Sequence, residues 1–143
     1  MRVVFWRHSR YYFEMSQYFI VSLKHTPKSD KYITVWRPDA RGYAWALSWA
    51  GRYSNDEVMA NLEYFNSGSD SLAVPVEILA RIAVDPGTGS IDNDAGPVVL
   101  NTAANWKVIV GAPICQPRNT PQPRYQKTRR VSCSDEAAAE AES

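Results

Sequence analysis

The pattern of apolar positions changes from strand-like to helical about one third of the way along the chain. Residues 18–23 and 31–36 are rich in β-branched and aromatic side chains and are separated by a turn-rich loop, which is typical of two strands. Residues 43–49 alternate with a period of two and predict a third strand. Residues 37–42 supply the Pro, Asp and Gly that a tight reversal needs. The short connections predict a three-stranded antiparallel β-meander.

The second half of the chain has helical spacing. A first helix is expected to begin at the capping box formed by Ser54 and Glu57. A second is expected over residues 75–83, with proline at its first position and Asp-Pro-Gly after its end. The spacing predicts a third over residues 97–111, although the β-branched run 108–110 would also suit a strand. The predicted fold is therefore α+β, a three-stranded meander followed by about three helices packed on one face of the sheet.

The regular pattern extends over residues 15–112, which we interpret as a single α+β domain. Residues 1–14 mix charged and aromatic side chains without a period, and they fit either an N-terminal arm or extension upstream of a start at Met15, or an edge strand over residues 3–6. Residues 113–143 are dense in Pro and Arg and then in acidic residues. Such a sequence has too few apolar groups to offset the entropy of ordering it, so a flexible tail is expected.

The composition of the 143 residues, with 45% hydrophobic and 12% aromatic side chains, excludes a wholly disordered chain. The sequence has no run of about 18 apolar residues, so no membrane-spanning helix is expected. The first residues are too charged and too short in apolar side chains for a signal peptide. These features predict a small soluble domain.

The net charge of +1 is the sum of four blocks of alternating sign. Residues 1–52 hold nine basic and three acidic residues, a balance of +6, and residues 53–95 hold one basic and eight acidic residues, a balance of −7. Residues 96–130 hold six basic residues and no acidic one, and the last 13 residues add −4. Such blocks either lie beside one another and partly neutralise, or form a surface that steers a charged partner.

No constellation for catalysis or for cofactor binding stands out from the sequence. His8 and His25 are 17 residues apart and lack a second ligand at helical spacing, whereas structural zinc needs four ligands. Cys115 and Cys133 are distant from them, and nothing local would orient a base toward Cys115. The Gly-Thr-Gly stretch is not followed by the Lys-Ser/Thr of a phosphate-binding loop. We therefore expect no catalytic residue, no metal, no cofactor and no enzymatic activity.

The best candidate binding surface is the predicted hairpin tip with its flanks. Two guanidiniums there, those of Arg37 and Arg41, can each hold a carboxylate or a phosphate through paired hydrogen bonds. Trp, Tyr and Arg are also the residue types enriched in protein–protein hot spots. The candidate binding residues are Trp36, Arg37, Asp39, Arg41, Tyr43 and Arg52.

The aromatic side chains of the third predicted strand allow two interpretations. Tyr43, Trp45 and Trp49 fall on one face of that strand, and a small sheet with one covered face is expected to bury them in the core. Exposed together, they would instead indicate a binding surface. Aromatic rings beside arginines can stack unpaired bases while the cations hold phosphates.

Several segments resemble a group of small accessory proteins encoded by bacteriophages and prophages, over about residues 15–110. The resemblance is carried by Tyr-Phe-Ile-Val-Ser-Leu-Lys-His-Thr (18–26), Tyr-Ile-Thr-Val-Trp-Arg-Pro-Asp (32–39), Gly-Tyr (42–43), Ser-Trp-Ala-Gly-Arg-Tyr (48–53), Asp-Ala-Gly-Pro-Val (94–98), Asn-Thr (101–102) and Ala-Asn-Trp (104–106). It implies no catalytic residues. It implies a cytoplasmic accessory role in a bacterial host during infection, such as inhibition of a host enzyme or defence complex.

We therefore expect a non-enzymatic phage-type accessory protein that binds a macromolecular partner, a host or phage protein, through the hairpin residues. The alternative is a single-stranded nucleic-acid-binding module that uses the strand aromatics and the basic tail, with an affinity that falls steeply with salt. The basic tail residues are Arg118, Arg124, Lys127, Arg129 and Arg130. No membrane partner is expected, and the sequence does not fix an oligomeric state.

Overall fold

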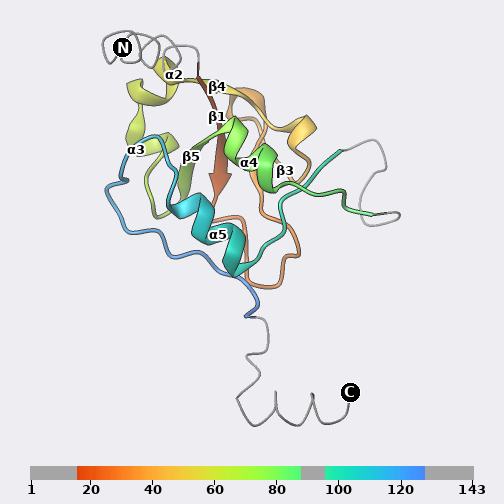
Figure 1. Ribbon diagram of the computed structural model, residues 1–143. Coiled ribbons are helices and arrows are strands. Elements are labelled where there is room, and N and C mark those ends of the chain that lie inside the picture. Colours follow the sequence, from red (N-terminus) through yellow and green to blue (C-terminus); the bar gives the residue numbers. More distant parts are fainter. Residues whose placement is uncertain (1–15, 88–95, 128–143) are drawn as a thin grey trace, which may run out of the picture.

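The computed structural model describes residues 16–87 and 96–127, and Figure 1 shows how they are arranged. The fold is α+β, as the sequence predicts. The strands are β1 (Gln17–Ser22), β2 (Val35–Trp36), β3 (Tyr43–Ala44), β4 (Tyr53–Ser54) and β5 (Ser71–Pro75). The α-helices of the described residues are α2 (Asn55–Ala60), α3 (Leu62–Phe65), α4 (Val76–Ile82) and α5 (Ala103–Val110). The predictions for residues 1–14 and for the acidic end of the tail lie outside the described residues.

β1 is the centre of a five-stranded antiparallel sheet, so the predicted three-stranded meander is wrong. β5 pairs with β1 along one edge, from Tyr18 opposite Pro75 to Ser22 opposite Ser71. The other edge of β1 pairs with β4 near its start and with β2 near its end, and β3 extends the sheet beyond β2. The sequence pattern hides β5, because its first four residues are all buried and therefore show no alternation.

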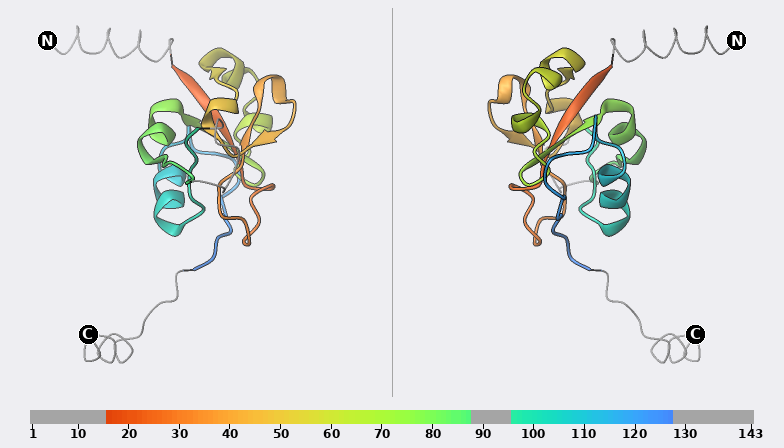
Figure 2. Two further views of the ribbon diagram at one scale, coloured as in Figure 1. Left: turned by 90° about the vertical axis from the view of Figure 1, so that its right-hand side faces the viewer. Right: turned by 90° about the vertical axis from the view of Figure 1, so that its left-hand side faces the viewer.

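The helices cover both faces of the sheet, and the prediction that they pack on one face is wrong. Phe19 of β1 belongs to a buried cluster with Leu79 of α4 and Trp106 of α5. Its neighbour Ile20 belongs to a second cluster with Phe65 of α3. Successive residues of a strand point to opposite faces, so the two clusters lie on opposite sides of the sheet. Figure 2 shows α4 and α5 on one side of β1 and α2 and α3 on the other.

Local chemistry sets where the helices begin and end. Ser54 caps α2 as predicted, because its Oγ accepts the N–H of Glu57 at 3.1 Å. The first predicted helix is interrupted at Asn61, whose φ of −147° and ψ of 61° are not helical. α5 is capped by Thr102 and does not begin at residue 97, because Val98 lies in extended bridges to neighbouring segments. No helix of the described residues is long and apolar enough to span a membrane.

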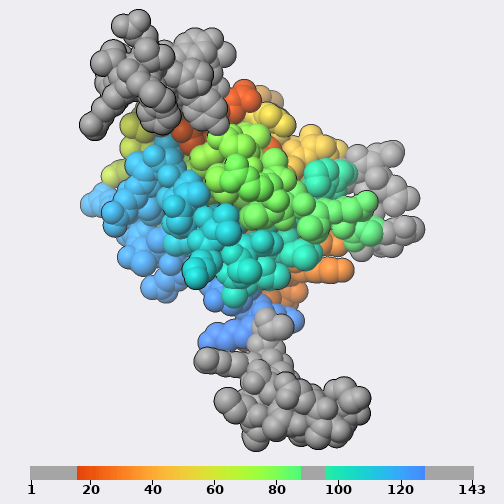
Figure 3. Space-filling view, viewed as in Figure 1, coloured from red at the N-terminus to blue at the C-terminus, as the bar shows by residue number. Residues whose placement is uncertain are grey.

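The sequence predicts a flexible tail from residue 113, but residues 113–127, here called the trailing segment, pack against the domain. Figure 3 shows this segment in blue against the body of the molecule. The Ile114 N–H donates to the Ala73 carbonyl of β5 at 2.8 Å. Asn66 links β5 to the trailing segment, because its Oδ1 accepts the Ala73 N–H at 3.0 Å and its Nδ2 donates to the Cys115 carbonyl at 3.1 Å. The backbone polar groups at the outer edge of β5 thus find hydrogen-bonding partners. These contacts order the trailing segment, and its amino-acid composition does not reveal them.

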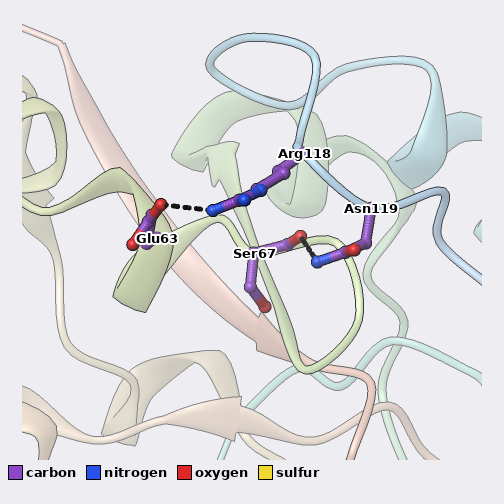
Figure 4. Close-up of polar contacts among 4 residues, drawn as sticks. All are labelled: Glu63, Ser67, Arg118 and Asn119. Atoms are coloured by element: carbon purple, nitrogen blue, oxygen red, sulfur yellow. Dashed lines mark hydrogen bonds and ion pairs between the residues drawn. The ribbon is translucent and has the colours of Figure 1, made fainter.

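A second set of contacts holds the trailing segment to the loop after α3, as Figure 4 shows. Asn119 donates from its N–H and from its Nδ2 to the Ser67 carbonyl, both at 3.1 Å. Arg118 forms an ion pair with Glu63 at 2.8 Å, but both side chains are 78% exposed. Ion pairs exposed to this extent contribute little, so the backbone contacts matter more.

Candidate functional site

A surface hollow of about 430 Å³ gathers aromatic, basic and acidic side chains from separate parts of the chain. His25 and Asp30 come from the loop after β1, Arg37 follows β2, and the others come from β3 and the residues after it. We call it the aromatic hollow and define it by His25, Asp30, Arg37, Tyr43, Trp45 and Trp49. Its volume lies in the range of about 300–1,000 Å³ that is usual for ligand sites.

The aromatic rings of the hollow are exposed, which corrects the expectation that they belong to the core. Tyr43 is 46% exposed, and Trp45 and Trp49 are each 40% exposed. The predicted third strand ends at Ala44, and a 3-10 turn at Leu47–Trp49 breaks the alternation. Leu47, at the position between Trp45 and Trp49 in the alternating pattern, is buried.

Arg37 is held in place within the hollow by two contacts. Its Nε donates to the Tyr43 carbonyl at 2.8 Å, and its guanidinium carbon lies 4.9 Å from the centre of the Trp49 ring. Among the described residues no hydrogen bond is made by its two Nη groups, so these donors are available. An oriented guanidinium stacked on an indole can still accept a carboxylate or a phosphate at its outer edge.

The loop that carries Arg37 is fixed by hydrogen bonds to the side chain of Tyr53 of β4. The Tyr53 hydroxyl donates to the Arg37 carbonyl at 2.5 Å and accepts the N–H of Ala40 at 2.9 Å. Burial raises the pKa of Tyr53 above its ordinary value, and the hydrogen bond from Ala40 opposes this in part. Gly51 lies against the same loop, where an added Cβ would come within 2.7 Å of the Pro38 Cα. These contacts therefore fix the backbone of the hairpin loop.

Hydrogen bonds and a ring contact also fix the loop after β1. The Thr26 Oγ1 donates to the Ser22 carbonyl at 2.6 Å and accepts the Thr34 N–H at 3.0 Å. The Nδ2 of Asn101 donates to the carbonyl of Asp30 at 3.0 Å. The His25 ring packs on the Tyr43 ring with their centroids 4.2 Å apart. These contacts place His25 and Asp30 at the hollow. Sequence reasoning missed both residues as contributors, because the folding of this loop brings them to β3.

The structure divides the six candidate binding residues among different places. Arg37 and Tyr43 line the aromatic hollow. Asp39 and Arg41 are exposed at the hairpin tip beyond it, and Asp39 has a φ of +58°. Arg52 lines a separate hollow of about 310 Å³, with its guanidinium carbon 5.6 Å from the Phe19 ring centre. These positions leave Arg37 and Tyr43 as the pair that the fold brings together.

Trp36 lies at 9% exposure in the core, although its place at the hairpin predicts an exposed side chain. Its ring meets Tyr64 at 5.0 Å and Phe65 at 5.8 Å between centroids. Strand β2 places Trp36 on the face that α2 and α3 cover, which explains the burial. Its buried Nε1 has no hydrogen-bonding partner among the described residues.

Within residues 16–87 and 96–127, no group of three or more His, Cys, Asp or Glu side chains could hold a metal ion. In comparisons with known proteins, no family model, curated protein or solved structure matches the chain. What the site can do therefore rests on its own geometry, which offers exposed rings to stack on and an oriented guanidinium to bind an anion.

Proposed function

We propose that the chain is a non-enzymatic binding protein that engages a macromolecular partner through the aromatic hollow. One observation carries the proposal: three large aromatic side chains, Tyr43, Trp45 and Trp49, are 40–46% exposed around Arg37. Contiguous exposed apolar surface of this kind marks interaction sites in soluble proteins. Trp, Tyr and Arg are the residues that most often dominate binding energy at such sites.

The surroundings of the hollow favour an extended partner over a small ligand. Asp39 and Arg41 lie exposed at the hairpin tip and carry polar groups beyond the hollow. A second hollow of about 220 Å³ adjoins the first, and His25 and Tyr43 line both. A partner that spans both hollows and the tip would use all of these groups.

The resemblance to phage-encoded accessory proteins supports a role in a bacterial host during infection. In this role the chain would inhibit a host or defence complex by binding a macromolecular component of it. Such binding needs an oriented surface and no chemical step, which suits a site of stacked rings and one guanidinium.

The test is partner capture by the 143-residue chain from a bacterial lysate, followed by identification of each retained protein or nucleic acid and titration of the purified partner. The variant Trp45→Ala/Trp49→Ala is compared with Met59→Ala, because Met59 is 46% exposed on α2 outside the hollow. We expect at least about a 10-fold rise in Kd for the double variant alone. Equal affinities for all three proteins would overturn the proposal.

A further inference from the structure

We propose that the occupant of the aromatic hollow is single-stranded nucleic acid, with bases stacked on the exposed rings and phosphates held by the surrounding cations. The inference rests on the proposed function and names the chemical class of the partner. Its evidence is the exposure and packing of the rings, the placement of the cations, and the position of three carboxylates.

The rings of the hollow are both exposed and held in place. Trp45 meets the buried Tyr32 edge to face, with centroids 5.5 Å apart and an interplanar angle of 62°. Tyr43 is packed by His25, and Trp49 by the Arg37 guanidinium. Each ring is thus supported by a neighbour while 40–46% of its residue surface stays exposed. Supported rings lose little further freedom when an unpaired base stacks on them.

Cations lie within and beside this ring cluster. Arg37 lies inside it, between the Tyr43 carbonyl and the Trp49 ring. The Nζ of Lys31 lies 5.5 Å from the centre of the Tyr32 ring, which in turn contacts Trp45. A backbone that follows the rings therefore passes positive groups along its course, as single-strand binding grooves require.

The trailing segment brings a further cation to the loop after β1. The Arg124 guanidinium donates to the Lys24 carbonyl at 3.0 Å and to the Leu23 carbonyl at 3.4 Å. Lys24 lines the smaller hollow together with His25 and Tyr43. Lys24 and Arg124, which belong to two positive blocks that are distant in the sequence, therefore meet at the loop after β1.

Three carboxylates near the rings determine which part of the nucleic-acid strand faces the hollows. Asp30 lines the aromatic hollow, and Glu63 and Asp70 line the smaller one. A carboxylate repels a phosphate but accepts hydrogen bonds from the amino groups of bases. The bases therefore enter the hollows, and the phosphates run outside along Lys31, Arg37, Lys24 and Arg124.

The test is a polarisation titration of the 143-residue chain with a labelled single-stranded oligonucleotide of mixed A and C and with its duplex. We expect the single strand to bind and the duplex to bind at least about 10-fold more weakly, because paired bases cannot stack on the rings. If Lys31, Arg37, Lys24 and Arg124 each neutralise one phosphate, affinity should fall by about 50-fold from about 50 to about 200 mM salt.

Matched variants separate stacking from charge. Trp45→Ala should weaken binding by about 10-fold, Trp45→Phe should retain most of it, and Met59→Ala should change nothing. Arg37→Gln should lower the salt slope by about 0.7, whereas Arg81→Ala on α4 should leave it unchanged. Trp45→Phe keeps a ring at a partly exposed position, so the comparison remains informative even if Trp45→Ala folds poorly.

No binding of the single strand at about 50 mM salt, or equal binding of strand and duplex, would overturn this inference. A protein captured from lysate that depends on Trp45 and Trp49, with no oligonucleotide binding, would overturn it while leaving the proposed function intact. If the chain binds neither an oligonucleotide nor a protein through the aromatic hollow, both this inference and the proposed function are overturned. The outcomes thus distinguish a wrong partner class from a wrong binding surface.

Discussion

The hydroxyl of Tyr53 donates a hydrogen bond to the carbonyl of Arg37 at 2.5 Å and so fixes the hairpin loop that borders the aromatic hollow. Tyr53 is only 2% exposed and belongs to β4, which pairs with the central strand β1. The same hydroxyl accepts the N–H of Ala40 at 2.9 Å. The position of the binding guanidinium therefore depends on a group that lies outside the hollow.

Removing this hydroxyl should cost both stability and binding. Tyr53→Phe deletes two hydrogen bonds and leaves the Ala40 N–H without its partner, so we expect unfolding to become easier by about 1–3 kcal/mol in a urea titration. Ligand binding at the hollow should weaken as well. Tyr64→Phe is the control for stability, because the exposed Tyr64 hydroxyl makes no hydrogen bond among the described residues. Equal losses of stability in the two variants would contradict the positioning role.

The stability of the domain should fall in alkaline solution because of the same residue. Burial raises the pKa of Tyr53, so the unfolded chain, with an ordinary tyrosine pKa of about 10, loses this proton first. The contribution is complete below about pH 10 and is lost as the pH rises toward the folded-state pKa. Urea midpoints measured from about pH 8 to 11 should drop more in the wild type than in Tyr53→Phe. Parallel curves would contradict the expectation.

The sequence reveals elements whose pattern is local and misses those that depend on the whole fold. The Ser54 cap and the core strand β1 follow from neighbouring residues, and both are found. β5 is missed because it is buried on both faces and so has neither strand nor helix periodicity. The alternation at residues 43–49 is misleading, because pairing with β2 stops after two residues and the chain then turns.

The same distinction applies to the candidate site. Arg37 and Tyr43 are identified because they lie at one hairpin, which is a local feature. His25 and Asp30 reach the hollow only through the loop contacts of Thr26 and Asn101, over separations that no pattern encodes. Trp36 shows the converse case, since its burial depends on α3 covering the other face of the sheet.

Asn101 should be one of the most sensitive positions of the domain. Its Oδ1 accepts the Trp106 Nε1 at 2.5 Å, and its Nδ2 donates to the carbonyls of Pro27 and Asp30. Asn101→Ala should lower the free energy of unfolding by about 2–4 kcal/mol, because it leaves a buried indole N–H unpaired. Asn105→Ala, which removes one hydrogen bond to Leu100, should cost about 1 kcal/mol. Similar losses in urea titrations of the two variants would contradict the role of Asn101 as a hub.

The attachment of the trailing segment should depend on its backbone contacts and not on its ion pair. Gly68 has a φ of +85°, and a Cβ there would lie 1.9 Å from the Asn119 carbonyl oxygen. Gly68→Ala should therefore destabilise the protein by about 1–3 kcal/mol and speed proteolysis after Arg118. Arg118→Ala loses only an exposed ion pair and should cost less than about 1 kcal/mol. A larger loss for Arg118→Ala would reverse this assignment.

The tryptophans of the hollow and of the core should respond oppositely in stability and in binding. Trp106 is 1% exposed and packs with Phe19 and Leu79, so Trp106→Ala should lower the free energy of unfolding by about 3–5 kcal/mol. Trp45 is 40% exposed and contacts Tyr32 at a single ring edge, so Trp45→Ala should cost no more than about 1.5 kcal/mol. The measurement is a pair of urea titrations together with partner binding for each variant that remains folded. If Trp45→Ala destabilised the domain as much as Trp106→Ala, Trp45 would be a core residue, and the exposed rings could no longer be assigned to a partner.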